Sequence, residues 1–392
     1  MAPQKDSLPS VFTLCCPDTV RVAGETIEGH VELDLHRAQQ DGVEDVSITL
    51  KGSVITTIHE TNTDGSDTKH QSTIPLIDTT TSLWQRGAAF PLPGSHILDL
   101  PFEFQLPSSL PPSFHFAVHH HKVSINYTME ILGSRPGLLR KDRRITKTFA
   151  VLPAASPTQI EAKLSLKQGW VGPWKTTVSE MKVRQGLCGG FGFARLEVEM
   201  PKLHSFPRAT PVPLQIMVET RTKPMLRTKQ PFDKHQKPLF PSPPDDIGRL
   251  KLNFCRETKM LAHRRSATRT DSHCISSATA KAVTSPPAEW IPDSEHPERG
   301  VWKRSVQFHS TICLPFAPTF ATETVQCKYY LRLDLPFPGR NNLSVYVPIR
   351  LDPVDPCPLP TDLNYALIPP ESPPPMDADI PPTYLSAIEH GL

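Results

Sequence analysis

Apolar and polar residues alternate along the first half of the chain, in short runs separated by clusters of Gly, Pro, Asn and Asp. A period of two places every second side chain on one face of a strand, and that face can be buried. The apolar positions of these runs are Val31, Leu33 and Leu35; Val46, Ile48 and Leu50; Leu98, Leu100, Phe102, Phe104 and Leu106; Val123, Ile125, Tyr127, Met129 and Ile131; and Ile145, Phe149 and Val151. The pattern predicts an antiparallel β-sandwich over residues 10–152.

The second half repeats the pattern after a gap. Between residues 153 and 190 the alternation is lost, and this stretch is predicted to be an interdomain linker. The alternation then returns at Leu196, Val198 and Met200; Val212, Leu214, Ile216 and Val218; Leu250, Leu252 and Phe254; Val325, Cys327, Tyr329, Leu331, Leu333 and Leu335; and Leu343, Val345, Val347, Ile349 and Leu351. These runs predict a second sandwich over 191–351, so the fold class is all-β, with two immunoglobulin-like sandwiches in tandem.

Two segments break the regularity and carry most of the charge asymmetry. Residues 221–270 hold thirteen Lys and Arg against four acids, and apolar residues are sparse up to about residue 300. We expect a basic, mostly disordered insertion at about 221–300, because it has little apolar surface to bury. Residues 352–392 hold seven acids, no Lys or Arg and eleven prolines. This composition predicts a disordered, acidic, proline-rich tail.

The amino-acid composition favours β structure and an intracellular location. The 392 residues include 44 prolines against 19 glycines, and this proline content is unfavourable for long helices. The eight cysteines show no CxxC spacing, and the chain starts without a basic segment followed by an apolar run, so we expect a cytoplasmic protein with free thiols. No window approaches 18 consecutive apolar residues, so any membrane contact is predicted to be peripheral.

Several strings resemble the two domains of arrestins. In the first half they are "VRVAGETIEGHVELDL" from Val20, "DVSITLKGSV" from Asp45, "LPGSHILDLPFEFQLPSSLPPSF" from Leu92 and "KVSINYTMEI" from Lys122. In the second half they are "FARLEVEMPK", "PVPLQIMVETRTK", "TICLPFAPTFATETVQCKYYLRLDL" and "LSVYVPIRL". Joined to the tail motif described next, they resemble the α-arrestins, also called arrestin-related trafficking adaptors. The resemblance implies arrestin-type sandwiches and a role as an adaptor between membrane proteins and ubiquitin ligases.

The tail contains a PPxY motif formed by Pro381, Pro382, Thr383 and Tyr384. Two prolines hold the backbone near polyproline II, in which three residues complete a turn, so Pro381 and Tyr384 project from one side. That side can dock on the aromatic-lined groove of a WW domain. A composition this rich in proline also produces such motifs by chance, and the arrestin-like domains before it favour the binding interpretation.

Two further groups of residues are candidate sites, each with a plain alternative. Arg135, Arg140, Lys141, Arg143 and Arg144 connect two predicted strands; they could contact acidic cargo or anionic lipid, or form a solvated hairpin loop. Ser266, Thr268, Ser272 and Ser285 lie beside arginines or a proline and are candidate phosphorylation positions, although such matches are common. Nucleic acid is not expected as a partner, because the basic segments lack interleaved aromatic residues.

Enzymatic and metal chemistry find little support. The chain lacks the GxSxG, GxxxxGK[ST] and HExxH motifs, and "GLCGGFGFARL" lacks a strand-to-helix setting for binding phosphate. His119 and His121 would share a face of a strand, but without a third ligand a solvent-facing strand edge is the simpler interpretation. No cofactor, metal or catalytic residue is therefore assigned.

The sequence predicts a non-enzymatic adaptor. By resemblance, its sandwiches engage a transporter or receptor at the plasma membrane or endosomes, while the PPxY recruits a WW-domain HECT-type ubiquitin ligase. Ubiquitination, endocytosis and sorting of the cargo then follow. Two alternatives stay open: a ubiquitin-independent trafficking scaffold of arrestin-like fold, and an enzyme with an unrecognised site.

Overall fold

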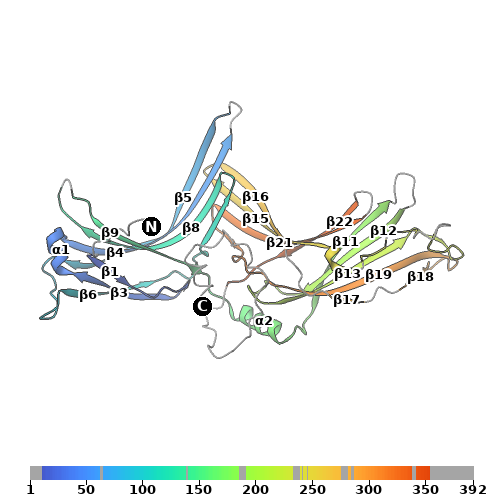
Figure 1. Cartoon of the computed structure of the whole chain (residues 1–392), viewed down its shortest axis with the longest axis horizontal. Helices are drawn as coiled ribbons and strands as arrows, with labels where there is room; N and C mark the ends of the chain where they lie inside the picture. Colours follow the sequence, from blue (N-terminus) through green and yellow to red (C-terminus); the bar gives the residue numbers. More distant parts are fainter. Residues whose placement is uncertain are drawn as a thin grey trace, which may run out of the picture.

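The structure is a computed structural model that describes residues 11–61, 65–137, 140–184, 191–232, 239–240, 242–244, 246–274, 281–283, 287–337 and 341–353. Its sheets form two β-sandwiches in tandem, at opposite ends of an elongated molecule (Figure 1). The prediction of an all-β fold with tandem sandwiches is confirmed. The predicted proline-rich tail lies outside the described residues from residue 354 onward.

The first sandwich consists of a three-stranded and a five-stranded sheet. The smaller sheet has the order β1 (Phe12–Cys15), β3 (Thr26–Asp34), β6 (Ile97–Gln105). The larger sheet contains β5 (Asp67–Gln85), β4 (Asp45–Thr61), β8 (His121–Ser134), and then β7 (Phe114–Val118) and β9 (Arg143–Phe149), which pair with successive halves of β8. A short parallel pair, β2 (Arg21–Val22) with β10 (Val151–Leu152), closes the end of the domain.

The second sandwich consists of a seven-stranded and a five-stranded sheet. The larger contains β11 (Trp174–Arg184), β12 (Phe191–Pro201), β13 (Val212–Thr222), β19 (Arg299–Ile312), β14 (Met225–Leu226), β17 (Lys281–Val283) and β18 (Glu289–Pro292). The smaller contains β16 (Arg265–Cys274), β15 (Lys251–Ala262), β21 (Val325–Phe337), β20 (Phe320–Ala321) and β22 (Asn341–Ile349). A single 3-10 turn, Ile247–Arg249, precedes β15.

Two short helices depart from the all-strand expectation. Helix α1 (Leu35–Asp41) follows β3; the carboxylate of Asp34 accepts from the Arg37 backbone N–H at 3.1 Å, and Gly42 ends the helix with a φ of 70°. An oxygen acceptor at the first position and a left-handed residue after the last are the usual signals that bound a helix. Leu35, expected to continue the strand, therefore begins this helix.

The stretch from 153 to 190, expected to be a linker, contains helix α2 (Pro157–Gln168) and the whole of β11. Pro157 occupies the first helical turn, where its missing N–H costs nothing, and the Ser156 N–H donates to Gln159 Oε1 at 2.7 Å. Strand β11 lies at the edge of its sheet and pairs along its whole length with β12. Its alternation was not recognisable, because the half-buried face carries the polar Thr177 and Ser179 while the apolar Val178 lies on the exposed face.

The expectation of a mostly disordered segment at about 221–300 was also wrong for the described residues. Strands β15 and β16 form a hairpin of ten residue pairs there, and β14, β17 and β18 pair with β19. Strand β16 has a polar inner face, with Arg269, Asp271 and His273 half-buried. These groups have polar partners, so the face is buried without an apolar pattern.

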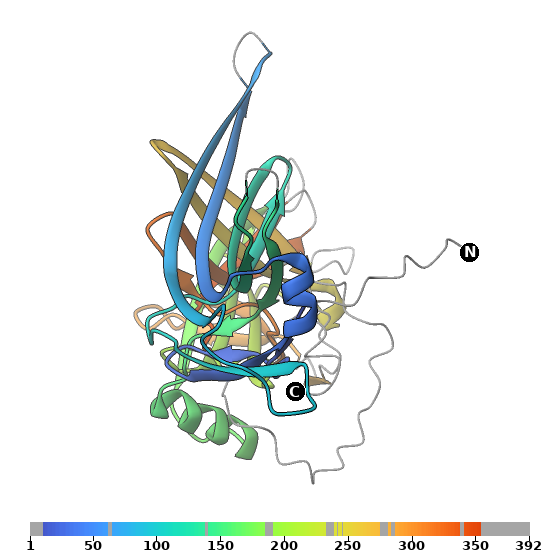
Figure 2. The ribbon, with the colours of Figure 1, turned by 90° about the vertical axis from the view of Figure 1, so that its left-hand side faces the viewer.

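The two sandwiches share one core. Their buried apolar residues form a single continuous cluster, rather than one for each domain. Strands β4 and β5 extend far beyond their own sandwich as a long hairpin, and the β15–β16 hairpin packs against it (Figures 1 and 2). This contact makes the boundary between the domains a packed seam.

Candidate functional site

The seam between the sandwiches brings together side chains that are far apart in sequence. Phe114 of β7 packs edge-on against Phe320 of β20, with ring centroids 4.9 Å apart. Thr56 of β4 donates to the hydroxyl of Thr324 at 3.3 Å, and both threonines are buried. The seam is thus held by direct contacts between side chains of both domains.

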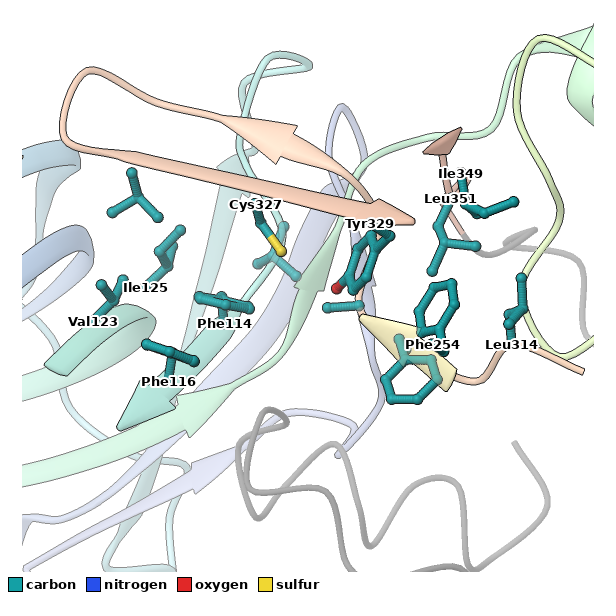
Figure 3. Close-up of a cluster of buried hydrophobic side chains, with 14 of the residues drawn as sticks. Phe114, Phe116, Val123, Ile125, Phe254, Leu314, Cys327, Tyr329, Ile349 and Leu351 are labelled. Carbon is teal, nitrogen blue, oxygen red and sulfur yellow. The ribbon is translucent and has the colours of Figure 1, made fainter. Parts of the chain in front are cut away.

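Figure 3 follows the buried side chains across this seam. Val123 and Ile125 of β8 lie on the first-domain side, and Phe254 of β15 and Tyr329 of β21 lie on the other. The rings of Phe254 and Tyr329 stack with centroids 5.0 Å apart. Burial raises the pKa of the neighbouring Cys327 thiol to about 11, so this cysteine stays protonated and behaves as a small apolar residue.

A buried ion pair lies at the centre of the seam. Arg256 of β15 has 4% of its side chain exposed, and it donates to both oxygens of Asp271 on β16, at 3.0 and 2.6 Å. Its guanidinium also lies 4.9 Å from the ring centroid of Phe116 and 5.8 Å from that of Phe114. Because Asp271 belongs to the second domain and the two rings to the first, one arginine joins the sandwiches.

The rim of the seam is rich in histidine and charge. Arg269 Nη2 lies 2.5 Å from Nε2 of His121, which is buried at the start of β8. Arg265 at the tip of the β15–β16 hairpin pairs with Glu60 of β4 at 3.3 Å. Burial, then the charge of Arg269 and the nearby histidines His59, His119 and His120, hold the pKa of His121 below its usual value.

An open groove of about 520 Å³ runs along one side of the seam. The first domain lines it with apolar residues of β4 and β5 and with a proline-rich stretch, and the second domain lines it with residues 320–323. The lining of the first domain includes Ile74, Leu76, Leu110, Pro111 and Pro112. Such a surface can accept an extended apolar segment of a partner.

The basic connection between β8 and β9 lies at the far end of the first domain, beside α1 (Figure 1). Two of its arginines are held by one residue: Arg143 pairs with the Asp41 carboxylate at 2.7 Å, and Arg135 donates to the Asp41 carbonyl at 2.7 Å. Arg144 pairs with Glu130 at 3.5 Å. Among the described residues, Arg140 and Lys141 form no ion pair, so their charges are the most available to a partner.

Three of the four candidate phosphorylation positions fall on β16. Ser266, Thr268 and Ser272 are exposed on the outer face of this edge strand, opposite the face that carries Arg269 and Asp271. Ser285 and the PPxY residues Pro381, Pro382, Thr383 and Tyr384 lie outside the described residues.

The histidine-rich stretch does not form the predicted strand edge. His119 and His120 are the turn between β7 and β8, and His119 has a φ of 55°. His121 is buried against Arg269 instead of facing solvent. The turn breaks the alternation, so His119 and His121 are not neighbours on one strand face.

Sequence reasoning missed the seam itself. Arg256 and Asp271 lie in the stretch that was predicted to be a mostly disordered insertion, because a charge in a polar stretch gives no sign of burial. The sequence does contain a signal for Arg256: it continues the alternation of Leu252 and Phe254, two residues beyond the end of the run that predicts a strand. Within the described residues, neither helix is long and apolar enough to cross a bilayer.

Residues 12–156 match the family model described as "Arrestin (or S-antigen), N-terminal domain". The first sandwich is therefore similar to arrestin N-terminal domains, in agreement with the resemblance carried by the strings of the first half. No curated protein matches the chain.

Proposed function

We propose that this chain is an α-arrestin adaptor that links a membrane-protein cargo to a WW-domain HECT-type ubiquitin ligase. The observation that carries the proposal is an arrestin N-terminal domain in the same chain as a PPxY motif. A second sandwich that shares a continuous core with the first supports it, because two joined domains give a broad binding unit.

The structure suggests how the sandwiches and the tail could act together. The chain leaves the second sandwich at Asp352, which is buried and accepts from Gln159 Nε2 of α2 at 2.6 Å. This bond fixes the point from which the tail departs, beside the seam. A ligase held at Tyr384 would then act on cargo held by the sandwiches, because tethering raises its effective concentration there.

Ligase recruitment is tested by binding of the full-length chain to isolated WW domains. We expect a dissociation constant on the order of ten micromolar, or roughly 7 kcal/mol, since the motif is single. Tyr384→Ala should abolish binding, because the tyrosine ring occupies one of the two contacts of the motif with the WW groove. Tyr365→Ala is the matched control in the same tail and should bind normally; unchanged binding by Tyr384→Ala would contradict recruitment.

The alternative is a ubiquitin-independent scaffold with the same fold. Truncation separates the two, and the structure places the cut after Pro353, because removing Asp352 would also break its bond to Gln159. Cargo internalisation in cells should fall to the level of the Tyr384→Ala variant if the adaptor proposal holds. A scaffold would retain its activity in both variants.

We further propose that Arg140 and Lys141 contact an acidic surface, either a cargo segment or anionic lipid. Arg135 and Arg143 position the connection through Asp41, and Arg144 is paired with Glu130. Charge near an anionic membrane contributes about 1 kcal/mol per residue. Arg140→Ser with Lys141→Ser should weaken sedimentation with phosphatidylserine vesicles more than the charge-matched pair Lys251→Ser with Lys259→Ser; equal weakening would argue for unspecific charge.

Phosphorylation is proposed at Ser266, Thr268 and Ser272, whose exposed side chains follow one strand face. Added phosphate would lower the positive charge of the β15–β16 hairpin and offer acceptors to a partner's arginines. Mass spectrometry of the chain purified from growing cells tests this. If the hairpin is unmodified under all growth conditions, the proposal is contradicted.

A further inference from the structure

The outer face of the small β1–β3–β6 sheet gathers a thiol, an imidazole and a carboxylate. A sulfur or side-chain nitrogen or oxygen atom of Cys15, His30 and Glu32 lies within 4.8 Å of each of the others. Cys15 of β1 stands directly opposite His30 of β3, and Glu32 follows two residues later on the same face. All three side chains are partly exposed, so an ion can reach them from solvent.

The strands, rather than loops, hold these groups in place. Val31 and Leu33 alternate with His30 and Glu32 and are fully buried, so a slip of one residue would expose the core. The next cysteine does not share the site: Arg21 Nη2 donates to Cys16 Sγ at 3.2 Å. Register therefore fixes which thiol faces the imidazole.

The same face concentrates negative charge. Glu32 stands directly opposite Asp99 of β6, and Glu28 stands opposite Glu103. Like charges in directly opposed pairs destabilise a sheet. Partial burial and the carboxylates of Glu32 and Asp99 also raise the pKa of the Cys15 thiol, against a smaller opposing effect of Lys147. A bound cation would relieve both effects.

We propose that Cys15, His30 and Glu32 bind a Zn²⁺ ion. A thiolate, an imidazole and a carboxylate form the mixed ligand set that suits this borderline-soft metal, whereas Mg²⁺ and Ca²⁺ require oxygen ligands. On binding, the Cys15 thiol releases its proton to water and its sulfur forms the metal bond. Asp99, opposite Glu32, or a water molecule completes the coordination.

A metal bound at this site would strengthen the attachment of β1 to the sheet. Among the described residues β1 pairs only with β3, over four residues. A metal bond from Cys15 to two residues of β3 would fasten this edge strand to the domain and stabilise the folded state by mass action. The site is independent of the proposed adaptor role, and neither fails with the other.

Cobalt spectroscopy of the metal-free, full-length chain tests the proposal. Co²⁺ should give a thiolate charge-transfer band and tetrahedral ligand-field bands, and Zn²⁺ should displace it. Cys15→Ser should remove the thiolate band, and Glu32→Gln, which keeps the size of the side chain, should weaken Zn²⁺ binding by about tenfold or more. Cys16→Ser, the control one residue away, should keep the bands.

Thermal unfolding gives a second measurement. Zn²⁺ should raise the melting temperature of the wild type and of Cys16→Ser, and leave that of Cys15→Ser unchanged. Circular dichroism shows whether Cys15→Ser is folded; if it is not, the Glu32→Gln titration decides alone. Absence of the thiolate band in the wild type, or its persistence in Cys15→Ser, would overturn the proposal.

Discussion

The guanidinium of Arg256 has charged and aromatic partners from both sandwiches, and 4% of its side chain is exposed. Removing one member of a buried pair leaves the other charge without its partner, which typically costs 3–5 kcal/mol. Asp271 keeps 22% of its side chain exposed, so we expect Arg256→Ala to lower the free energy of unfolding by about 3 kcal/mol. Urea denaturation measures this.

The matched control is the surface pair of Arg86 and Glu44, with 51% and 44% of the two side chains exposed at 2.7 Å separation. Arg86→Ala should cost less than about 1 kcal/mol, because solvent screens exposed pairs. Similar losses in the two variants would mean that Arg256 contributes no more than a surface charge.

At the scale of elements, the long β4–β5 hairpin depends on a glycine. A Cβ added at Gly52 would lie 2.7 Å from Tyr127 Cδ1 and 2.8 Å from Ile77 Cγ2. Tyr127 cannot easily move away, because its buried hydroxyl donates to the Pro111 carbonyl at 2.7 Å. Gly52→Ala should therefore cost about 1–3 kcal/mol by overpacking. Ser53→Ala, at the next position of the bulge, should have a much smaller effect in the same denaturation experiment.

The elements that the sequence did predict are those with one apolar face. Strands β3, β6, β8 and β21 follow alternating runs whose apolar members are buried. Strand β5 has 19 residues but almost no buried side chain, so its sequence contains no such signal. Strand β16 buries polar groups, and α2 lies in the stretch that was predicted to be a linker because the alternation is lost there. Strands that bury polar side chains, or almost no side chains, show no alternation of apolar and polar residues and cannot be predicted from it.

At the scale of the whole molecule, sequence indicated the two sandwiches but not their joint. Contacts such as Thr56 with Thr324 join residues separated by 268 positions, and no local pattern encodes such a pairing. The same holds for the thiol, imidazole and carboxylate of the proposed zinc site, which only the register of β1 with β3 brings together. The adaptor hypothesis rests on the resemblance to a family, whereas the seam between the domains is visible only in the three-dimensional structure.

The seam should respond to pH through His121. Arginine is a donor only, so the contact between Arg269 Nη2 and His121 Nε2 requires an unprotonated Nε2. The pKa of His121 is lowered in the folded state, by burial first and then by Arg269 and by His59, His119 and His120. The unfolded chain therefore takes up the proton first as the pH falls below about 6.5, and stability is lost through that range.

We expect the melting temperature to fall between pH 7 and pH 5, with an increase in the radius of gyration measured by small-angle scattering as the sandwiches separate. His121→Gln supplies an amide oxygen that Arg269 can still donate to and that does not titrate, so the pH dependence of both quantities should shrink. The exposed histidine His309 on β19 provides the control, because His309→Gln makes the same substitution outside the contacts of the seam. An equal pH response in wild type and His121→Gln would show that the pH sensitivity lies elsewhere, whereas a response lost only in His121→Gln would locate it at the joint between the two domains.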